Sequence, residues 1–287
     1  MRIMVTGGNG QLGKVVMDRF SKIGDLVLGF DLPGFDVVDS QKLSGVLEQF
    51  EPDVVVHCAA YTDVNGSQRE PVSAMAVNWL GTTNVAVACT RFKARMVYIS
   101  TSFVFDGVKP DPYFEWDKPN PIGVYGLSKL KGEEAVRAHC PDHVILRTNW
   151  LYGTEGRGFP ERIVETARKM PVTVVNDQWG DPTSADALAN AICRVVADGV
   201  SGTFHASCTG GGCTKHELAV AALKAAGIEQ EVISCMTDSY DRIKPAGMVA
   251  ERPKNSRMDN VMLRLAIGWA MPDWREELER RFRHISP

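Results

Sequence analysis

Short apolar runs alternate with longer segments of helical periodicity through the first 150 residues of the chain. The apolar runs are residues 2–5, 26–30, 54–57, 96–100 and 144–147. Strands separated by helices predict a parallel sheet with crossover connections. Because the runs are continuously apolar rather than alternating, we expect helices on both faces of the sheet, as in a doubly wound α/β fold.

The alternation weakens after residue 147, where glycines and prolines mark irregular segments. Residues 172–175 and 203–206 resemble strands that could return to the main sheet, with a helix over 184–197 between them. We therefore predict a larger domain over 1–150 that regains segments at about 172–206. Residues 151–287 are expected to form mainly a second, smaller C-terminal domain.

Composition places the chain among soluble globular proteins. It is 44% apolar and 23% charged over 287 residues, which excludes the disordered, collagenous and coiled-coil classes. The net charge of −3 offers no basic field for a nucleic-acid partner. The longest uncharged stretch, 73–90, contains Asn78, Thr82, Thr83 and Asn84, which indicates a buried helix rather than a membrane span. Without a signal-peptide pattern at the start, a cytoplasmic location is expected.

The seven cysteines predict free thiols. Their number is odd and no CxxC motif occurs, so a disulfide framework is not expected. His205, Cys208, Cys213 and His216 cluster in the sequence, but their spacing fits a zinc site poorly. We expect no bound metal.

A glycine-rich loop follows the first apolar run and opens a helix expected over 11–23. Gly7, Gly10 and Gly13 satisfy the spacing of a dinucleotide-binding fingerprint, with Gln11 and Leu12 inside it. Glycines allow the tight turn and the close approach of the backbone to a pyrophosphate, while the helix N-terminus supplies N–H groups and positive dipole. The loop predicts a nicotinamide dinucleotide, NADH or NADPH, as cofactor.

Asp31 ends the second run, where an acid can accept hydrogen bonds from a ribose diol. No lysine or arginine lies between Asp31 and Gln41 to receive a 2′-phosphate. NADH is therefore expected to bind at least as well as NADPH. Asp36 and Val37 are candidates for an adenine contact, and a solvated turn is an equal alternative for the acid.

A second motif offers acid–base chemistry. Tyr125 and Lys129 are four residues apart at the start of a helical run, which places both side chains on one face. An ammonium close to a phenol favours the phenolate and lowers its pKa from about 10. Thr101 and Ser102 lie at the end of the fourth run, where doubly wound folds place ligands. Together these residues predict proton delivery to a carbonyl.

Eight ordered blocks resemble the extended short-chain dehydrogenase/reductase superfamily, and within it the dTDP-4-dehydrorhamnose reductases. The blocks are GQLG (10–13), PDVVVHCAAYTDV (52–64), ISTSFVFDG (99–107), PIGVYGLSKLKGE (121–133), RTNWLYG (147–153), DQWGDPT (177–183), RPKNSR (252–257) and PDWREELER (272–280). The resemblance spans almost the whole chain. It implies a Rossmann-type sheet with a smaller C-terminal substrate-binding domain, and reduction of the C4 ketone of a dTDP-6-deoxy-L-hexulose to dTDP-L-rhamnose.

The resemblance also implies roles for individual residues. Tyr125 matches the proton donor, Lys129 the residue that holds the ribose and lowers the phenol pKa, and Thr101 the hydroxyl that tunes the site. Thr101, Ser102 and Trp150 match substrate contacts, although Trp150 could equally be a packed core residue. Cofactor-contacting positions are matched by Gly10, Gln11, Leu12, Asp31, Asp36, Val37, Ala59, Ala60 and Tyr61.

The chain departs from the family pattern beside the reacting carbon. Ser102 and Phe103 stand where the family usually has Asp and Tyr, and Asn65, Gly66 and Gln68 replace charged residues after the third run. Missing polar partners change which hydroxyl groups a pocket accepts, so a different nucleotide-linked keto sugar stays open as substrate.

Two further polar residues have alternative interpretations. His57 could act as a general base, but its place inside an apolar run favours a hydrogen-bonded core residue. Arg147 and the RPKNSR segment could pair with nucleotide phosphates, since the arginine fork suits them. For that segment a solvated loop is an equal alternative.

Other functions share much of this motif set. One is a non-catalytic NAD(P)-binding regulatory subunit of the methionine adenosyltransferase type, which would not need Thr101, Tyr125 and Lys129 together. Another is a nucleotide-sugar epimerase or dehydratase, which retains its cofactor through turnover. The sequence does not decide between a monomer and a homodimer.

Overall fold

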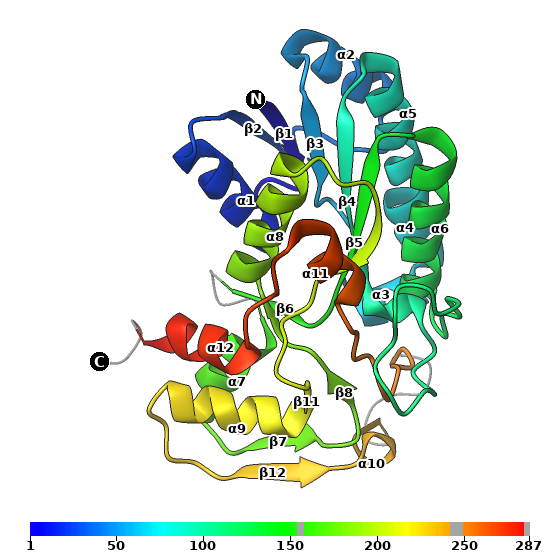
Figure 1. Cartoon of the computed structure of the whole chain (residues 1–287). Coiled ribbons are helices and arrows are strands. Elements are labelled where there is room, and N and C mark those ends of the chain that lie inside the picture. Colours follow the sequence, from blue (N-terminus) through cyan, green and yellow to red (C-terminus); the bar gives the residue numbers. More distant parts are fainter. Residues whose placement is uncertain (154–157, 242–248, 284–287) are drawn as a thin grey trace.

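A computed structural model describes residues 1–153, 158–241 and 249–283 of the chain. The described residues form a central parallel sheet in the order β10, β5, β4, β3, β1, β2 (Figure 1). Its strands are β1 (Arg2–Thr6), β2 (Leu26–Phe30), β3 (Val54–His57), β4 (Arg95–Thr101), β5 (His143–Thr148) and β10 (Gly202–His205). All five predicted strands of the first 150 residues are confirmed, and so is the doubly wound α/β class.

Alternate residues of the central strands enter two different apolar cores. Ile3 and Val5 pack on one face with helices α1 and α8, whereas Met4 packs on the other face with α2, α5 and α6. This two-sided burial explains why the strands are continuously apolar. The covering helices are α1 (Gln11–Lys22), α8 (Ala185–Ala197), α2 (Ser40–Phe50), α5 (Thr82–Phe92) and α6 (Val124–His139).

The long uncharged stretch is helical, as predicted. It comprises α4 (Pro71–Met75), the π-helical turn η1 (Ala76–Gly81) and α5, and follows α3 (Val64–Arg69). By length and apolar composition the run Pro71–Phe92 could cross a membrane. Val85, Ala86 and Cys89 instead pack against the sheet, which accounts for much of its apolar character.

The C-terminal part hangs below the carboxyl edge of the sheet (Figure 1). It contains short strand pairs, β7 with β12, β8 with β11 and β6 with β9. The remaining elements are β6 (Leu151–Tyr152), α7 (Phe159–Ala167), β7 (Val172–Val175), β8 (Trp179–Gly180), β9 (Thr183–Ser184), β11 (Cys213–Thr214), α9 (Lys215–Ala225), β12 (Val232–Cys235), α10 (Thr237–Asp241), α11 (Val261–Ile267), α12 (Trp274–Phe282) and the short 3₁₀ turn η2 (Ser102–Val104).

One of the two predicted returning strands joins the main sheet and the other does not. β10 pairs in parallel with β5, and α8 packs beside α1, so the return near residue 203 is confirmed. The prediction for 172–175 is wrong, because β7 pairs with β12 in a separate two-stranded sheet. A partner strand sixty residues further along cannot be read from periodicity alone. The proposed domain division near residue 150 stays a prediction.

Candidate active site

A cavity of about 690 Å³ opens at the carboxyl edge of the sheet. Doubly wound folds bind their ligands at this edge, because the loops that follow the strands diverge there. The cavity collects nearly every residue selected from the sequence. Those lining it are Gly7, Gly10, Gln11, Leu12, Gly13, Asp31, Asp36, Val37, Ala59, Ala60, Tyr61, Thr101, Tyr125, Lys129 and Trp150.

The glycine loop forms the floor of the cavity, and its glycines have different tasks. Gly7 has a φ of 69°, and a Cβ on it would lie 2.7 Å from the Ala59 nitrogen. A Cβ on Gly13 would lie 2.1 Å from the Gly7 carbonyl oxygen, so this glycine lets α1 start against the loop. Gly10 has an ordinary φ of −71°, and the one non-neighbouring atom of the described chain within 4 Å of its missing Cβ is the Gly7 carbonyl oxygen, at 3.1 Å. Its open side therefore faces the cavity, where a ligand can approach the backbone.

The start of α1 suits the pyrophosphate of a dinucleotide. Gly10 is its N-cap and makes no side-chain cap hydrogen bond, so the first N–H groups of the helix are oriented toward the cavity. The side-chain amide nitrogen (Nε2) of Gln11 is buried without a hydrogen-bond partner in the described part of the chain. A buried donor of this kind is costly unless a ligand acceptor meets it. The residues present fit the nicotinamide dinucleotide that the sequence predicts.

The end of the cavity beside β2 is acidic and apolar. Asp31 accepts backbone hydrogen bonds from Asn9 (3.0 Å) and Leu32 (2.8 Å), which fix its carboxylate at the cavity wall. The only lysine or arginine side chains among the described lining residues are those of Lys129 and Arg162, after other strands. The preference for NADH at least equal to NADPH stays a prediction, and this lining supports it.

Asn78 connects the loop after β3 to the helix that carries the acid–base residues. Its side chain accepts a hydrogen bond from the Tyr61 N–H (2.8 Å) and donates to the Tyr61 carbonyl (3.1 Å) and the Ser128 hydroxyl (2.9 Å). Ser128 in turn donates to the Tyr125 carbonyl. We did not identify Asn78 from the sequence, because nothing in a lone asparagine on a helix signals a bridge.

Tyr125 and Lys129 lie on one face of α6, as their spacing predicts, and reach the cavity beside Thr101 at the end of β4. The Lys129 ammonium lies 4.2 Å from the centre of the Tyr98 ring. Phe103 meets the Tyr125 ring edge-on, with centroids 5.8 Å apart. Phe103 therefore supports the phenol by packing and offers no hydrogen bond to a sugar.

The pKa shifts of Tyr125 and Lys129 differ from the expectation. Burial raises the pKa of Tyr125, while a hydrogen bond with the Thr101 hydroxyl lowers it. Burial also lowers the pKa of Lys129 to about 7, against an opposing effect of Glu133. The expectation that Lys129 depresses the phenol pKa is thus not supported by the protein's own groups. Thr101 supplies the favourable interaction instead.

A buried ion pair lies directly behind these residues. Glu133 accepts hydrogen bonds from Arg147 at 2.8 Å to each oxygen, from Ser100 at 2.6 Å and from Arg137 at 2.8 Å. The Glu133 and Arg147 side chains are 0% and 2% exposed. The suggestion that Arg147 pairs with nucleotide phosphates is therefore wrong. Its guanidinium neutralises a carboxylate of the protein, and the pair ties α6 to β4 and β5.

At the strand ends, Ser102 lies outside the cavity and Thr148 lies inside it, in contrast to the expected substrate contacts. Ser102 is fully buried and donates to the Asn149 side chain at 3.0 Å, outside the cavity, so its position does not support the expected substrate contact. Thr148 lines the cavity, and its hydroxyl is buried without a partner in the described chain. The rule that selected Thr101 applies equally to Thr148, because both end neighbouring strands.

Trp150 is half-buried: it lines the cavity and also packs against the main apolar core. Its φ of 39° lies in the left-handed region that bulky side chains rarely adopt. Such strain is retained where the surrounding structure imposes it, and it occurs preferentially at ligand sites.

His57, His205 and His216 each make hydrogen bonds within the protein. His57 is buried between the hydroxyls of Thr6 (2.7 Å) and Thr82 (3.0 Å), and burial lowers its pKa to about 3. The interpretation as a core histidine is confirmed. In the described part of the chain no group of three or more His, Cys, Asp or Glu side chains could hold a metal. His205 and His216 bond separate backbone carbonyls, those of Asp259 and Val232.

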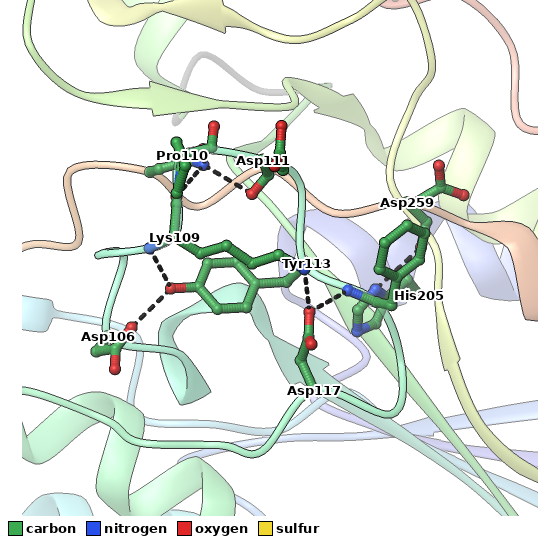
Figure 2. A network of polar contacts seen from close by, with 10 residues as sticks. Asp106, Lys109, Pro110, Asp111, Tyr113, Asp117, His205 and Asp259 are labelled. Atoms are coloured by element: carbon green, nitrogen blue, oxygen red, sulfur yellow. Dashed lines mark hydrogen bonds and ion pairs between the residues drawn. The ribbon is translucent and has the colours of Figure 1, made fainter.

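A second cavity of about 670 Å³ lies between the loop after β4 and the RPKNSR segment. Figure 2 shows how the first of these walls is fixed: Tyr113 donates to Asp106 at 2.6 Å and accepts from the Lys109 N–H. The Lys109 ammonium pairs with Asp117 at 2.7 Å. In the other wall, Asn255 and Ser256 are buried, so this segment is not a simple solvated loop.

Comparison with known proteins assigns the family. The model of the family described as "RmlD substrate binding domain" matches residues 1–286. A dTDP-4-dehydrorhamnose reductase of Sinorhizobium fredii is 34% identical over 98% of this chain and 96% of its own. A dTDP-4-keto-6-deoxy-D-glucose reductase of Streptomyces niveus is 34% identical over 79% of this chain and 80% of its own.

A solved structure agrees with these relatives. The dTDP-4-dehydrorhamnose reductase of Bacillus anthracis, in complex with NADP, is 35% identical, with a TM-score of 0.92. The match covers 99% of this chain and 98% of that one. The chain belongs to the RmlD substrate-binding-domain family and is an NAD(P)-dependent oxidoreductase.

Proposed function

We propose that the protein reduces the C4 ketone of a nucleotide-linked 6-deoxy-hexulose, with dTDP-4-dehydro-L-rhamnose as substrate and dTDP-L-rhamnose as product. The observation that carries this proposal is the convergence of Tyr125, Thr101 and Lys129 on the cavity that contains the glycine loop. The named activities of the relatives support the same reaction class.

Each cavity residue has a different role in such a reduction. When bound, the reduced nicotinamide supplies a hydride to the carbonyl carbon. Tyr125 gives its phenol proton to the carbonyl oxygen, and the Thr101 hydroxyl, which hydrogen-bonds the phenol, stabilises the phenolate that remains. Lys129 lines the same cavity one helical turn after Tyr125, where its ammonium can donate hydrogen bonds to the ribose of the cofactor.

The residues expected beside the sugar do not specify which hexulose is the substrate. Phe103 presents a ring edge to Tyr125, and Ser102 is bonded to Asn149. Neither offers the acid or the phenol that the family usually has, so a hydroxyl of the sugar lacks those partners. The panel of substrates must therefore include other 4-keto sugars linked to dTDP and to UDP.

The test is oxidation of NADH and of NADPH with this panel, with and without a 3,5-epimerase, in wild-type protein and in Tyr125→Phe. The variant keeps the ring and removes the proton donor, so we expect kcat to fall by about 10² or more with little change in cofactor affinity. Tyr152→Phe is the matched control, since the Tyr152 hydroxyl lies outside the cavity and has no partner in the described chain.

Near-normal turnover by Tyr125→Phe would reject the assignment of the proton donor. A blank across the whole panel, with cofactor binding intact, would reject the proposed substrate class and favour the regulatory-subunit alternative. We also propose a cytoplasmic location, to which seven free cysteines are suited. Sedimentation analysis will distinguish the monomer from the homodimer.

A further inference from the structure

The indole ring of Trp150 is contacted by two segments of the C-terminal part. The Lys215 ammonium lies 3.5 Å from the centre of this ring and 4.5 Å from the centre of the Phe159 ring. The backbone of Gly180 lies against the same indole, since a Cβ on this glycine would lie 2.5 Å from the indole Cε2 atom. Lys215 and Gly180 lie outside the cavity lining, whereas Trp150 belongs to it. The two segments therefore reach the active site through one ring.

A short strand pair brings Lys215 and Gly180 to this ring. β8 and β11 are antiparallel, with Cys213 opposite Gly180, and Lys215 follows two residues later as the first residue of α9. The Thr214 hydroxyl accepts the Glu217 N–H (3.1 Å), and the Glu217 carboxylate accepts the Thr214 N–H (2.8 Å). This capping box fixes the direction in which the helix starts, and with it the place of the Lys215 side chain.

A lysine at the start of α9 is unfavourable for the helix itself. The first turn carries the positive end of the helix dipole, so an ammonium there is destabilising. Burial adds to this cost and lowers the pKa of Lys215 to about 7. The faces of Trp150 and Phe159 offset part of it, because the quadrupole of an aromatic ring attracts a cation. Neither the helix dipole nor burial favours a cation at position 215, whereas its contact with the indole does.

The backbone of Trp150 is held separately from its side chain. Its φ of 39° is in the left-handed region, its carbonyl accepts the Thr183 N–H (3.3 Å), and the next residue begins the pairing of β6 with β9. These contacts fix where the side chain starts, but they leave its χ angles free. A ring that borders a cavity can change rotamer unless other side chains restrain it. Lys215 and Gly180 provide that restraint.

We propose that Lys215, together with Gly180, fixes the plane of the Trp150 indole at the cavity wall and so shapes the surface against which the sugar of the substrate packs. Lys215 is then a positioning residue, because it acts through Trp150. This inference rests on the proposed function, since it takes the sugar as the group that meets this wall. Aromatic walls contribute to the shape of a ligand site. Ser102 and Phe103 offer the sugar no polar partner, so packing against the indole gains importance.

The kinetic test compares wild-type protein with Lys215→Met and Lys215→Arg at about pH 6, where Lys215 is charged. Methionine keeps most of the stem and removes the cation. We expect the KM of the sugar substrate to rise by about threefold to tenfold, with kcat and the KM of the cofactor within about twofold of wild type. Arginine retains a cation over the ring and should restore the KM. Lys224→Met, exposed near the other end of α9, is the matched control and should leave all three constants unchanged.

Gly180→Ala tests the same ring through its other contact. The new Cβ would lie 2.5 Å from the indole Cε2 atom, so the ring must turn while the cation stays in place. We expect a rise of the sugar KM similar to that of Lys215→Met. Gly45→Ala is the control, since its Cβ enters open space on α2. Gly180→Ala also keeps the proposal falsifiable if Lys215→Met does not fold.

Fluorine NMR gives a readout that does not depend on turnover. With 5-fluorotryptophan at the six tryptophan positions, the Trp150 resonance is the one that Trp150→Phe lacks. In the cofactor-free protein, Lys215→Met and Gly180→Ala should move and broaden this resonance and leave the other five in place. Lys215→Arg and Lys224→Met should keep it close to its wild-type position and width.

Four outcomes would overturn the inference. An unchanged Trp150 resonance in Lys215→Met, or an unchanged sugar KM in a variant whose ring has moved, would do so and leave the reductase proposal intact. A loss that Lys215→Arg does not restore would assign position 215 to the stability of the fold, and an equal rise in the KM of the cofactor would assign the wall to the cofactor. A blank substrate panel would instead reject the proposed function and the role given to the sugar, whereas a broadened resonance in Lys215→Met would still support fixation of the ring.

Discussion

Glu133 illustrates how one buried residue supports an active site that it does not touch. It lies one helical turn after Lys129 and accepts hydrogen bonds from β4, β5 and its own helix. Its negative charge raises the pKa of Lys129, which burial alone would lower further. Glu133 is thus a positioning residue, which holds the two strand ends and α6 together and keeps the lysine charged.

Glu133→Gln should show both effects. Removing one partner of a buried pair leaves Arg147 insufficiently neutralised, so we expect the free energy of unfolding to fall by about 3–5 kcal/mol in urea denaturation. The pKa of Lys129 should fall, and the corresponding limb of the pH profile of kcat/KM should move to lower pH.

Glu134→Gln is the control for that change. Glu134 is the next residue on α6, but it is half exposed and pairs with Lys131 at the surface. Its loss should cost less than about 1 kcal/mol and leave the pH profile in place. Equal effects of the two substitutions would contradict the role given to Glu133.

At the scale of elements, the sequence predicts well wherever a local pattern and the fold agree. The parallel strands, the glycine loop and the Tyr125–Lys129 face are each encoded by neighbouring residues, and each is found as predicted. The structure does not support the expected substrate contact of Ser102, because the chain enters the turn η2 there and directs the side chain to Asn149. Non-local pairings such as β7 with β12, or Arg147 with Glu133, leave no periodic signal along the chain.

The contact between the glycine loop and α1 can be tested by one methyl group. In Gly13→Ala the new Cβ would lie 2.1 Å from the Gly7 carbonyl oxygen, so loop and helix must separate. We expect a loss of about 1–3 kcal/mol in the free energy of unfolding and weaker binding of both NADH and NADPH. Thermal unfolding and fluorescence titration of the cofactor measure the two effects.

Gly45→Ala provides the opposite case, in a helix on the other face of the sheet. Gly45 lies inside α2, and nothing stands within 4 Å of the Cβ it would gain. The substitution should stabilise the protein by about 0.5–1 kcal/mol and leave cofactor binding unchanged. If Gly13→Ala behaved in the same way, the steric role given to Gly13 would be wrong.

At the scale of the whole molecule, the buried Lys129 and the half-buried Lys215 link stability to pH. Lys129 and Lys215 each have a folded pKa of about 7, whereas the unfolded chain titrates at about 10.4. Between these values the unfolded state binds more protons than the folded state. The free energy of unfolding therefore rises as the pH increases from about 7, by up to about 1.4 kcal/mol per pH unit for each lysine.

Other groups limit the window in which this rise is visible. Burial raises the pKa of the Cys58 and Cys208 thiols to about 12, so above about pH 9 they oppose the rise and largely cancel it. Between pH 7 and 8.5 we expect the cofactor-free protein to gain about 2–4 kcal/mol in urea denaturation. Lys129→Met and Lys215→Met should each lose about half of this gain, and exposed Lys224→Met should lose none. A flat profile in wild-type protein would mean that both ammonium groups find compensating charge in the folded state, and would contradict the lowered pKa values of the two lysines.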